Sequence, residues 1–157
     1  MEGESVDLCH SGGILEHQSV EELRGVIAEI HRVLKPGGIS SHVFDHRDHL
    51  YHADKRMWFL NHLRYSEGGY RLLFGHRLLF HNRLMPGEIE NLFLESGFDK
   101  VAIRRLILAD RPTYVDQPEE AIQGKLGLPR ELLAPAFRGA SDADLHTAAA
   151  HYIFKKR

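Results

Sequence analysis

A strand, a helix and a second strand follow one another within residues 6–45, and this unit constrains the fold more than any other feature. The apolar run at residues 6–9 leads into a loop with two adjacent glycines, and a second strand-like run occupies residues 38–45. Between them, apolar residues recur every three or four positions from residue 19 to residue 34, which predicts a helix with one buried face. Two strands joined in this way pair in parallel through a right-handed crossover, so the sequence predicts an α/β fold.

Residues at both ends of this helix predict where it begins and ends. Ser19 and Glu22 have the spacing of a capping box, in which the side chain of each accepts a hydrogen bond from the backbone N–H of the other. After the helix, Lys35, Pro36 and Gly37 supply a cation for the helix end, a residue that cannot continue a helix and a glycine stop.

The later part of the chain alternates predicted elements with one long connection. The predicted elements are a helix at 86–96, a strand at 101–103 and 106–108, and a last strand at 148–154. Residues 47–63 favour a helix, whereas the pattern at 71–80 does not decide between types. Residues 110–140 contain four prolines and form a long excursion between the last two strands, with a short helix at 118–126.

Length and charge limit the function classes. A chain of 157 residues with 43% hydrophobic and 27% charged residues is expected to be a single globular domain over residues 1–157. Its 20 Lys and Arg residues against 22 Asp and Glu residues give a formal net charge of −2. No basic excess is available to neutralise a phosphate backbone, so nucleic acid is not expected as a partner.

The sequence carries no membrane or secretion signal. No apolar run reaches the roughly 18 residues that a membrane span needs, and the first residues lack the layout of a signal peptide. The single cysteine, Cys9, permits no internal disulfide and is expected to be a small buried apolar residue. We therefore expect a cytoplasmic protein that does not associate with membranes.

Two motifs together resemble those of a known enzyme family. The segment VDLCHSGGILEH at residues 6–17, followed by IHRVLKPGG at residues 30–38, resembles class I S-adenosylmethionine-dependent methyltransferases of the type 11-like group. In this resemblance, residues 15–17 follow the family's fourth strand and residues 32–38 lead into its fifth. Residues 45–49, 82–84 and 97–98 resemble later family elements. The implied fold is α/β, a partial Rossmann-like methyltransferase sheet of strands four to seven with an antiparallel last strand, flanked by helices.

The resemblance extends only to the C-terminal half of the family fold. The family's glycine-rich cofactor loop follows its first strand, but no two of the 14 glycines here are separated by a single residue, so not even a minimal Gly-x-Gly occurs. The resemblance thus implies a truncated or split enzyme that methylates a small or glycan-like acceptor. This chain alone is expected to bind S-adenosyl-L-methionine weakly or not at all, and to be inactive.

The resemblance also predicts an unpaired sheet edge. In the complete family sheet, the fourth strand lies beside the first, so Val6 to Cys9 would expose unpaired backbone amides and carbonyls. We expect this strand to pair with a second copy in a homodimer, to pair with a missing N-terminal half, or to fray. The alternative function is a degenerate, non-catalytic interaction or dimerisation module of the methyltransferase fold.

Candidate site residues follow from the same resemblance. His10, Ser11 and Gly12 stand where the family holds the methionine end of its cofactor. Glu16 and His17 are candidate catalytic residues that position or deprotonate the acceptor, because histidine is the commonest general base near neutral pH. The alternative is that Glu16 and His17 only brace the loop before the helix.

Four further candidates lie beyond the second strand. His49 is a candidate catalytic residue at the pocket mouth, and Asp45, Asn82 and Arg83 are candidate acceptor-binding residues, since arginine offers a fork for carboxylate or phosphate groups. The alternative for Asp45 and His49 is a solvated surface. The alternative for Asn82 and Arg83 is a structural tie to the next helix.

Two residue groups carry competing interpretations. A metal site is a third hypothesis, for which the sequence offers these residues: His42, His46, His49 and His52 with Asp45 and Asp48. The leading interpretation needs no metal. The following aromatic residues are expected in the core or in an acceptor pocket: Trp58, Phe59, Tyr65, Tyr70, Phe74 and Phe80.

Overall fold

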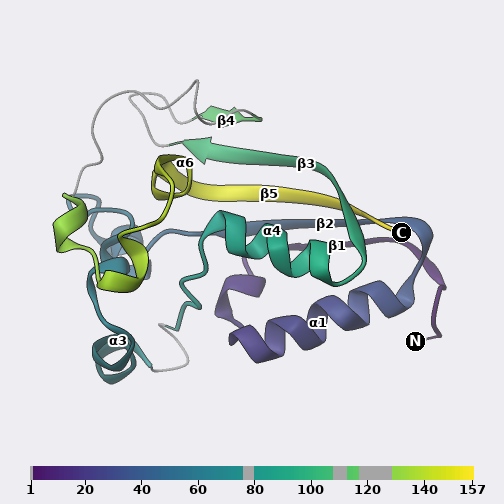
Figure 1. The fold of residues 1–157 in the computed structure, drawn as a ribbon, viewed down its shortest axis with the longest axis horizontal. Helices are drawn as coiled ribbons and strands as arrows, with labels where there is room; N and C mark the ends of the chain where they lie inside the picture. Colours follow the sequence, from purple (N-terminus) through teal and green to yellow (C-terminus); the bar gives the residue numbers. More distant parts are fainter. Residues whose placement is uncertain (1, 76–79, 108–112, 117–128) are drawn as a thin grey trace.

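The computed structural model describes residues 2–75, 80–107, 113–116 and 129–157, and it shows an α/β fold built on one mixed sheet (Figure 1). The strands are β1 (Val6–Gly12), β2 (Leu34–Asp45), β3 (Phe98–Ile107), β4 (Thr113–Val115) and β5 (Thr147–Lys156). The α-helices are α1 (Val20–Val33), α2 (His49–Ala53), α3 (Glu67–Phe74), α4 (Pro86–Glu95) and α6 (Asp142–His146). Short 3-10 helices are η1 (Leu15–His17), η2 (Asn61–Arg64), η3 (Arg130–Leu132) and η4 (Pro135–Phe137).

The strand order confirms the fold class expected from the sequence. The sheet runs β1-β2-β5-β3-β4, with β1 parallel to β2 and β5 antiparallel to both β2 and β3. The predicted strand-helix-strand unit and the antiparallel last strand are therefore both present. The strand β4 was not predicted. Among the described strands, β1 has a neighbour on one side only.

Helix α1 begins as its sequence predicts. The Ser19 N–H donates to the Glu22 carboxylate at 2.8 Å, and the Glu22 N–H donates to the Ser19 hydroxyl at 3.2 Å, which completes the capping box. The next strand begins at Leu34, earlier than predicted, because the expected turn is absorbed into β2 as an irregularity. There Gly37 takes a φ of +78°, and the β1–β2 register passes from Leu34 to Ile39.

Outside this unit, the predictions were less complete. The helix expected at residues 47–63 was only partly right, because α2 ends at Ala53 and Asp54 turns its carboxylate onto the Arg56 backbone N–H and guanidinium. The helix expected at 86–96 is confirmed as α4, with Pro86 in its first turn. The predicted helix at 118–126 and the last residue of the predicted strand at 106–108 lie outside the described residues.

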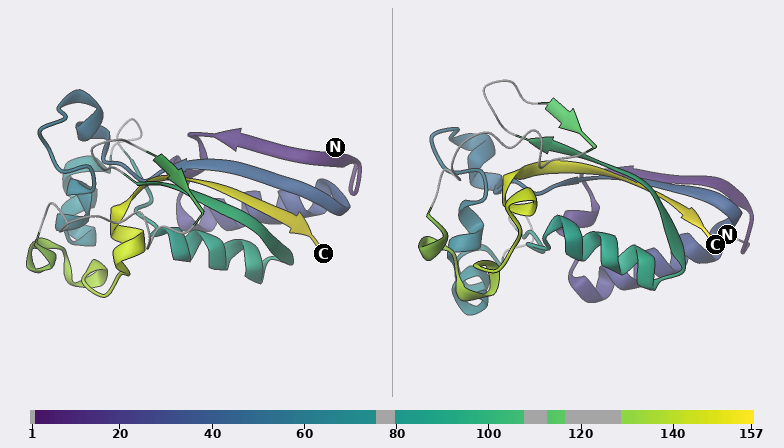
Figure 2. Two further views of the ribbon diagram at one scale, coloured as in Figure 1. Left: turned by 90° about the horizontal axis from the view of Figure 1, so that it is seen from above. Right: turned by 45° about the horizontal axis from the view of Figure 1, so that its top comes forward.

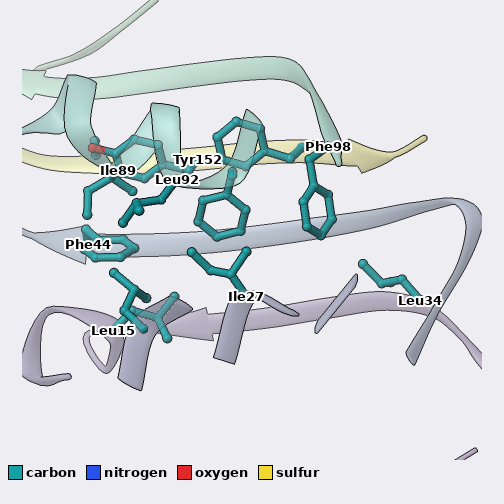
Figure 3. Close-up of a cluster of buried hydrophobic side chains, with 12 residues drawn as sticks. Leu15, Ile27, Leu34, Phe44, Ile89, Leu92, Phe98 and Tyr152 are labelled. Atoms are coloured by element: carbon teal, nitrogen blue, oxygen red, sulfur yellow. The ribbon is translucent and has the colours of Figure 1, made fainter. Parts of the chain in front are cut away.

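One face of the sheet carries both long helices. Along β2 the side chains of Ser40, His42 and Phe44 are buried, whereas the alternate residues are partly exposed. Figure 2 shows α1 and α4 together on the buried side, with no described helix against the opposite face over the middle of the sheet. Apolar and aromatic side chains from η1, α1, α4, β2, β3 and β5 pack together there, including those labelled in Figure 3.

A second apolar cluster lies beyond the carboxyl ends of β1 and β2. Its buried members are Leu60, Leu63, Met85, Leu133 and Leu145. The Ala134 N–H donates to the Leu63 carbonyl at 2.9 Å, so the described end of the long excursion packs against the segments that follow β2. This cluster supports the loops around the candidate site.

Four described histidines, His42, His46, His62 and His81, are buried within the folded chain, and burial lowers the pKa of each. Burial lowers the pKa of His42 to about 4, that of His46 to about 3 and that of His81 to about 4. The His42 ring nitrogens hydrogen-bond with the Ser11 and Ser40 hydroxyls, both at 2.8 Å. These polar groups are therefore satisfied without charge.

We predict that Leu23→Ala destabilises the fold far more than Val20→Ala, although both residues lie on α1. Leu23 is 0% exposed and Val20 is 39% exposed. The first change should lower the free energy of unfolding by about 2–5 kcal/mol, because it leaves a cavity in the core. The second should change it by roughly 0.5 kcal/mol or less. Denaturant titration of both variants measures this, and equal losses would contradict the assigned orientation of α1.

We predict that the fold loses stability on acidification between pH 6.5 and about 4. The buried histidines bind protons in the unfolded chain at the upper end of this window, but in the folded chain only near pH 4 or below. Each such histidine should contribute a slope of about 1.4 kcal/mol per pH unit. Urea titrations across this range should show a shallower slope for His42→Gln, and an unchanged slope would disprove the assignment.

Candidate functional site

The carboxyl ends of β1 and β2 meet at one edge of the sheet, where ligands of open α/β sheets bind. After β1, Gly13 takes a φ of +65° and its N–H donates to the Val43 carbonyl at 3.0 Å. This turn sends the chain into η1, which places Glu16 and His17 beside the end of β2. The Glu16 carboxylate accepts a hydrogen bond from the Asp45 N–H at 3.2 Å.

A segment that is distant from η1 in the sequence holds η1 in place. We call residues 80–83 the strap. The His17 Nδ1–H donates to the Phe80 carbonyl at 3.1 Å. The Asn82 N–H donates to the Glu16 carbonyl at 2.8 Å, and the Asn82 side chain is used for hydrogen bonds within the same region. The strap therefore holds Glu16 and His17, two of the three predicted catalytic residues.

His81 joins the strap to β2. Its Nε2–H donates to the Asp45 carbonyl at 2.7 Å, and its Nδ1 accepts from the Arg83 N–H at 2.9 Å. The His81 N–H in turn donates to the Tyr70 hydroxyl at 3.1 Å. Both ring nitrogens are thus occupied in the neutral form, which agrees with the low pKa of this buried ring. Sequence reasoning missed His81, although it stands directly before the Asn82-Arg83 motif.

His17 has the geometry of a general base. A carbonyl can only accept, so the hydrogen bond to Phe80 places the ring proton on Nδ1 and leaves the Nε2 lone pair available. The His17 side chain is exposed, and the His49 ring lies 5.0 Å away between centroids. Burial, followed by the nearby His17 and His52 rings, lowers the pKa of His49. The structure thus brings these two predicted catalytic histidines together.

Glu16 is almost completely buried beside them. Burial raises the pKa of its carboxyl group, and hydrogen bonds from backbone N–H groups offset part of that effect. Its Oε1 accepts from the Asp45 N–H, while its Oε2 has no hydrogen-bond partner among the described residues. A buried oxygen of this kind is costly to leave unpaired. It marks Glu16 as a polar group that simple bracing of the loop does not explain.

The predicted acceptor-binding residues are largely engaged within the chain. The Asp45 carboxylate pairs with the Arg47 guanidinium at 2.6 and 2.7 Å and lies 3.2 Å from the His52 Nε2. Burial raises the pKa of Asp45, but the hydrogen bonds from Arg47 outweigh it and the net shift is downward. The buried Arg83 guanidinium donates to the Tyr65 carbonyl at 2.8 Å and pairs with a glutamate of α3. Their arrangement in this structure is that of supports for the site.

The predicted cofactor contacts stand at the end of β1. Gly12 and His10 are exposed there, whereas the Ser11 hydroxyl is turned onto His42 on the helix side of the sheet. Gly12 and His10 are thus accessible at this edge. The structure offers no glycine-rich loop around these residues within its described part, so they fit only one side of a cofactor site.

The histidines considered for a metal site point in different directions. His46 is buried, with Nδ1 donating to the Leu84 carbonyl at 3.2 Å and Nε2 lying 3.0 Å from the Tyr152 hydroxyl. His42 faces α4, and His52 faces Asp45. Within the part of the chain that the structure describes, no three His, Cys, Asp or Glu side chains are arranged to hold a metal ion.

A cavity of about 430 Å³ adjoins the strap, between the first turn of α1 and α3. Tyr70 and Phe80 line it, whereas Trp58 and Phe59 pack against the second apolar cluster. The predicted aromatic residues are therefore divided between pocket and core.

None of the described helices is long and apolar enough to cross a membrane.

One family model matches part of the chain. Residues 1–41 match the family model of the methyltransferase domain. Among curated proteins, none matches the chain in sequence.

Three solved structures share the fold. A SAM-dependent methyltransferase from Thermotoga maritima is 12% identical with a TM-score of 0.55, and the alignment covers 100% of this chain and 59% of that one. An S-adenosylmethionine-dependent methyltransferase from Mesorhizobium loti is 14% identical with a TM-score of 0.51, covering 98% and 63%. A SAM-dependent methyltransferase from Archaeoglobus fulgidus is 12% identical with a TM-score of 0.54, covering 99% and 62%.

The chain therefore spans less than two thirds of the length of these three proteins. At such identities the structural likeness establishes the fold alone. The chain therefore has the fold of S-adenosylmethionine-dependent methyltransferases, and its residues 1–41 match the model of the methyltransferase domain.

Proposed function

We propose that this chain is the acceptor side of a methyltransferase that moves a methyl group from S-adenosylmethionine to a small or glycan-like molecule. One observation carries the proposal: His17 presents an available Nε2 at the carboxyl end of β1, beside the buried Glu16 carboxylate. Ligands of open α/β sheets bind at this edge, and the fold is that of methyltransferases.

The residues of the site have distinct roles in this proposal. S-adenosylmethionine, when bound, supplies an electrophilic methyl group. His17 Nε2 accepts the proton of the acceptor, while its Nδ1–H stays on the Phe80 carbonyl and keeps the ring oriented. The Glu16 carboxylate favours the resulting imidazolium, since the two side chains interact electrostatically. The strap keeps η1 against β2 throughout.

The cofactor site is proposed to be completed across β1. Its outer edge has no described neighbour, and the Leu8 side chain on it is 56% exposed. An apolar edge strand of this kind readily accepts a further strand. We propose that the adjoining strands carry the glycine-rich cofactor loop, which the described chain does not supply.

A second candidate function uses the unpaired outer side of β1 for binding and involves no catalysis. A non-catalytic interaction module is favoured by the exposed Leu8 and by a sheet face that no described helix covers over its middle. In that case β1 would pair with β1 of another copy. The two candidates differ in what the isolated chain does in solution.

We predict that S-adenosylhomocysteine binds the isolated chain more weakly than about 1 mM. Only one side of the cofactor site is present, so most of the contacts that give a micromolar affinity are lost. Calorimetric titration of the purified chain measures this, with the same titration into a complete methyltransferase as the control. Micromolar binding by the isolated chain would disprove the proposal that the site is completed across β1.

We predict that the isolated chain is monomeric and that the outward amides of β1 exchange hydrogen rapidly. These amides lack a sheet partner, whereas those of β2 are paired on both sides. Sedimentation and hydrogen exchange at several protein concentrations test this. A stable dimer with β1 protected, which Leu8→Lys dissociates, would favour the interaction module instead.

A further inference from the structure

The cavity beside the strap has two charged walls of opposite sign. Its volume of about 430 Å³ falls in the range of small-molecule sites, which run from about 300 to 1,000 Å³. One wall is α3 and the other is the first turn of α1. Of the arginine and glutamate side chains that line the cavity, only Arg83 of the strap was given a role by the sequence analysis.

The α3 wall together with Arg83 of the strap carries one net positive charge. Glu67 pairs with the buried Arg83 guanidinium, and the Arg71 Nε lies 3.4 Å from the same carboxylate. Arg83 is fixed further by the Tyr70 ring, 4.2 Å from its guanidinium carbon. Two guanidinium groups thus share one carboxylate. Arg71, whose side chain is 76% exposed, is the one that a ligand can reach.

The α1 wall carries one negative charge. Glu21 lines the cavity from the first turn of α1, where the helix dipole favours a carboxylate. No ion pair of Glu21 occurs with the described residues. Its neighbour Glu22, in contrast, is used in the capping box.

Uncharged groups lie between these two walls. The Tyr70 and Phe80 rings line the cavity, and they suit the hydrocarbon part of a ligand. His81 also lines it, and burial keeps this ring neutral, so it adds no further charge. The cavity therefore presents a cation, an apolar surface and an anion.

We propose that the cavity binds a small zwitterion whose ammonium group pairs with Glu21 and whose carboxylate pairs with Arg71. A molecule with both charges satisfies both walls, whereas a simple amine or a simple acid leaves one wall unmatched. That this zwitterion is the methyl acceptor rests on the proposed function. Its binding does not, because the cavity is formed by this chain alone.

The test is calorimetric titration of the full chain with three probes of equal length: 6-aminohexanoate, hexylamine and hexanoate. The zwitterion should bind at least tenfold more tightly than either singly charged probe. Glu21→Gln should abolish its advantage over hexanoate, and Arg71→Gln its advantage over hexylamine. Both residues are exposed, so the folded state should persist, and thermal unfolding of each variant checks this.

Matched controls are Glu95→Gln and Arg56→Gln, which remove the same charges at exposed positions that do not line the cavity. They should leave all three affinities unchanged. Equal binding of a singly charged probe, or no binding of the zwitterion, would overturn the proposal. Binding of the zwitterion without methyl transfer in any completed enzyme would uphold this inference and count against the proposed function alone.

Discussion

The parallel pairing of β1 with β2 determines where everything else in this structure can act. Because α1 crosses between them on one side of the sheet, both strands end at the same edge, and the loops that leave them must meet there. The core formed by α1 and α4 against β2 and β5 holds this arrangement. The candidate site is then formed by the short loops that leave β1 and β2, which the sheet places near one another.

The strap converts that placement into a defined site. It reaches η1 through the Phe80 carbonyl and the Asn82 N–H, and it reaches the end of β2 through His81. Arg83 anchors the strap by inserting a charged group among carbonyls and aromatic rings. Each of these contacts joins residues more than ten positions apart, so the site depends on the complete fold.

The sequence predicted the strand-helix-strand unit well because its signals are local. The capping box at Ser19 and the apolar period of α1 need no knowledge of the rest of the chain. The antiparallel last strand was expected from the family resemblance, whereas the order of the strands was not predicted. The start of β2 and the end of α2 were misjudged, because register with β1 and the turn at Asp54 decided them.

For the site, the structure brings the candidates His17 and His49 together, but several other side chains are engaged in ways that the sequence did not indicate. Arg83 was expected to face an acceptor, yet its charge is engaged inside the chain, and Ser11 turns away from the edge. His81 gave no signal, because its role arises from contacts across the fold. Since the strap holds His17 through the main-chain oxygen of Phe80, this contact does not itself depend on which side chain stands at position 80. A comparison of sequences alone would then overlook the contact that orients the His17 ring.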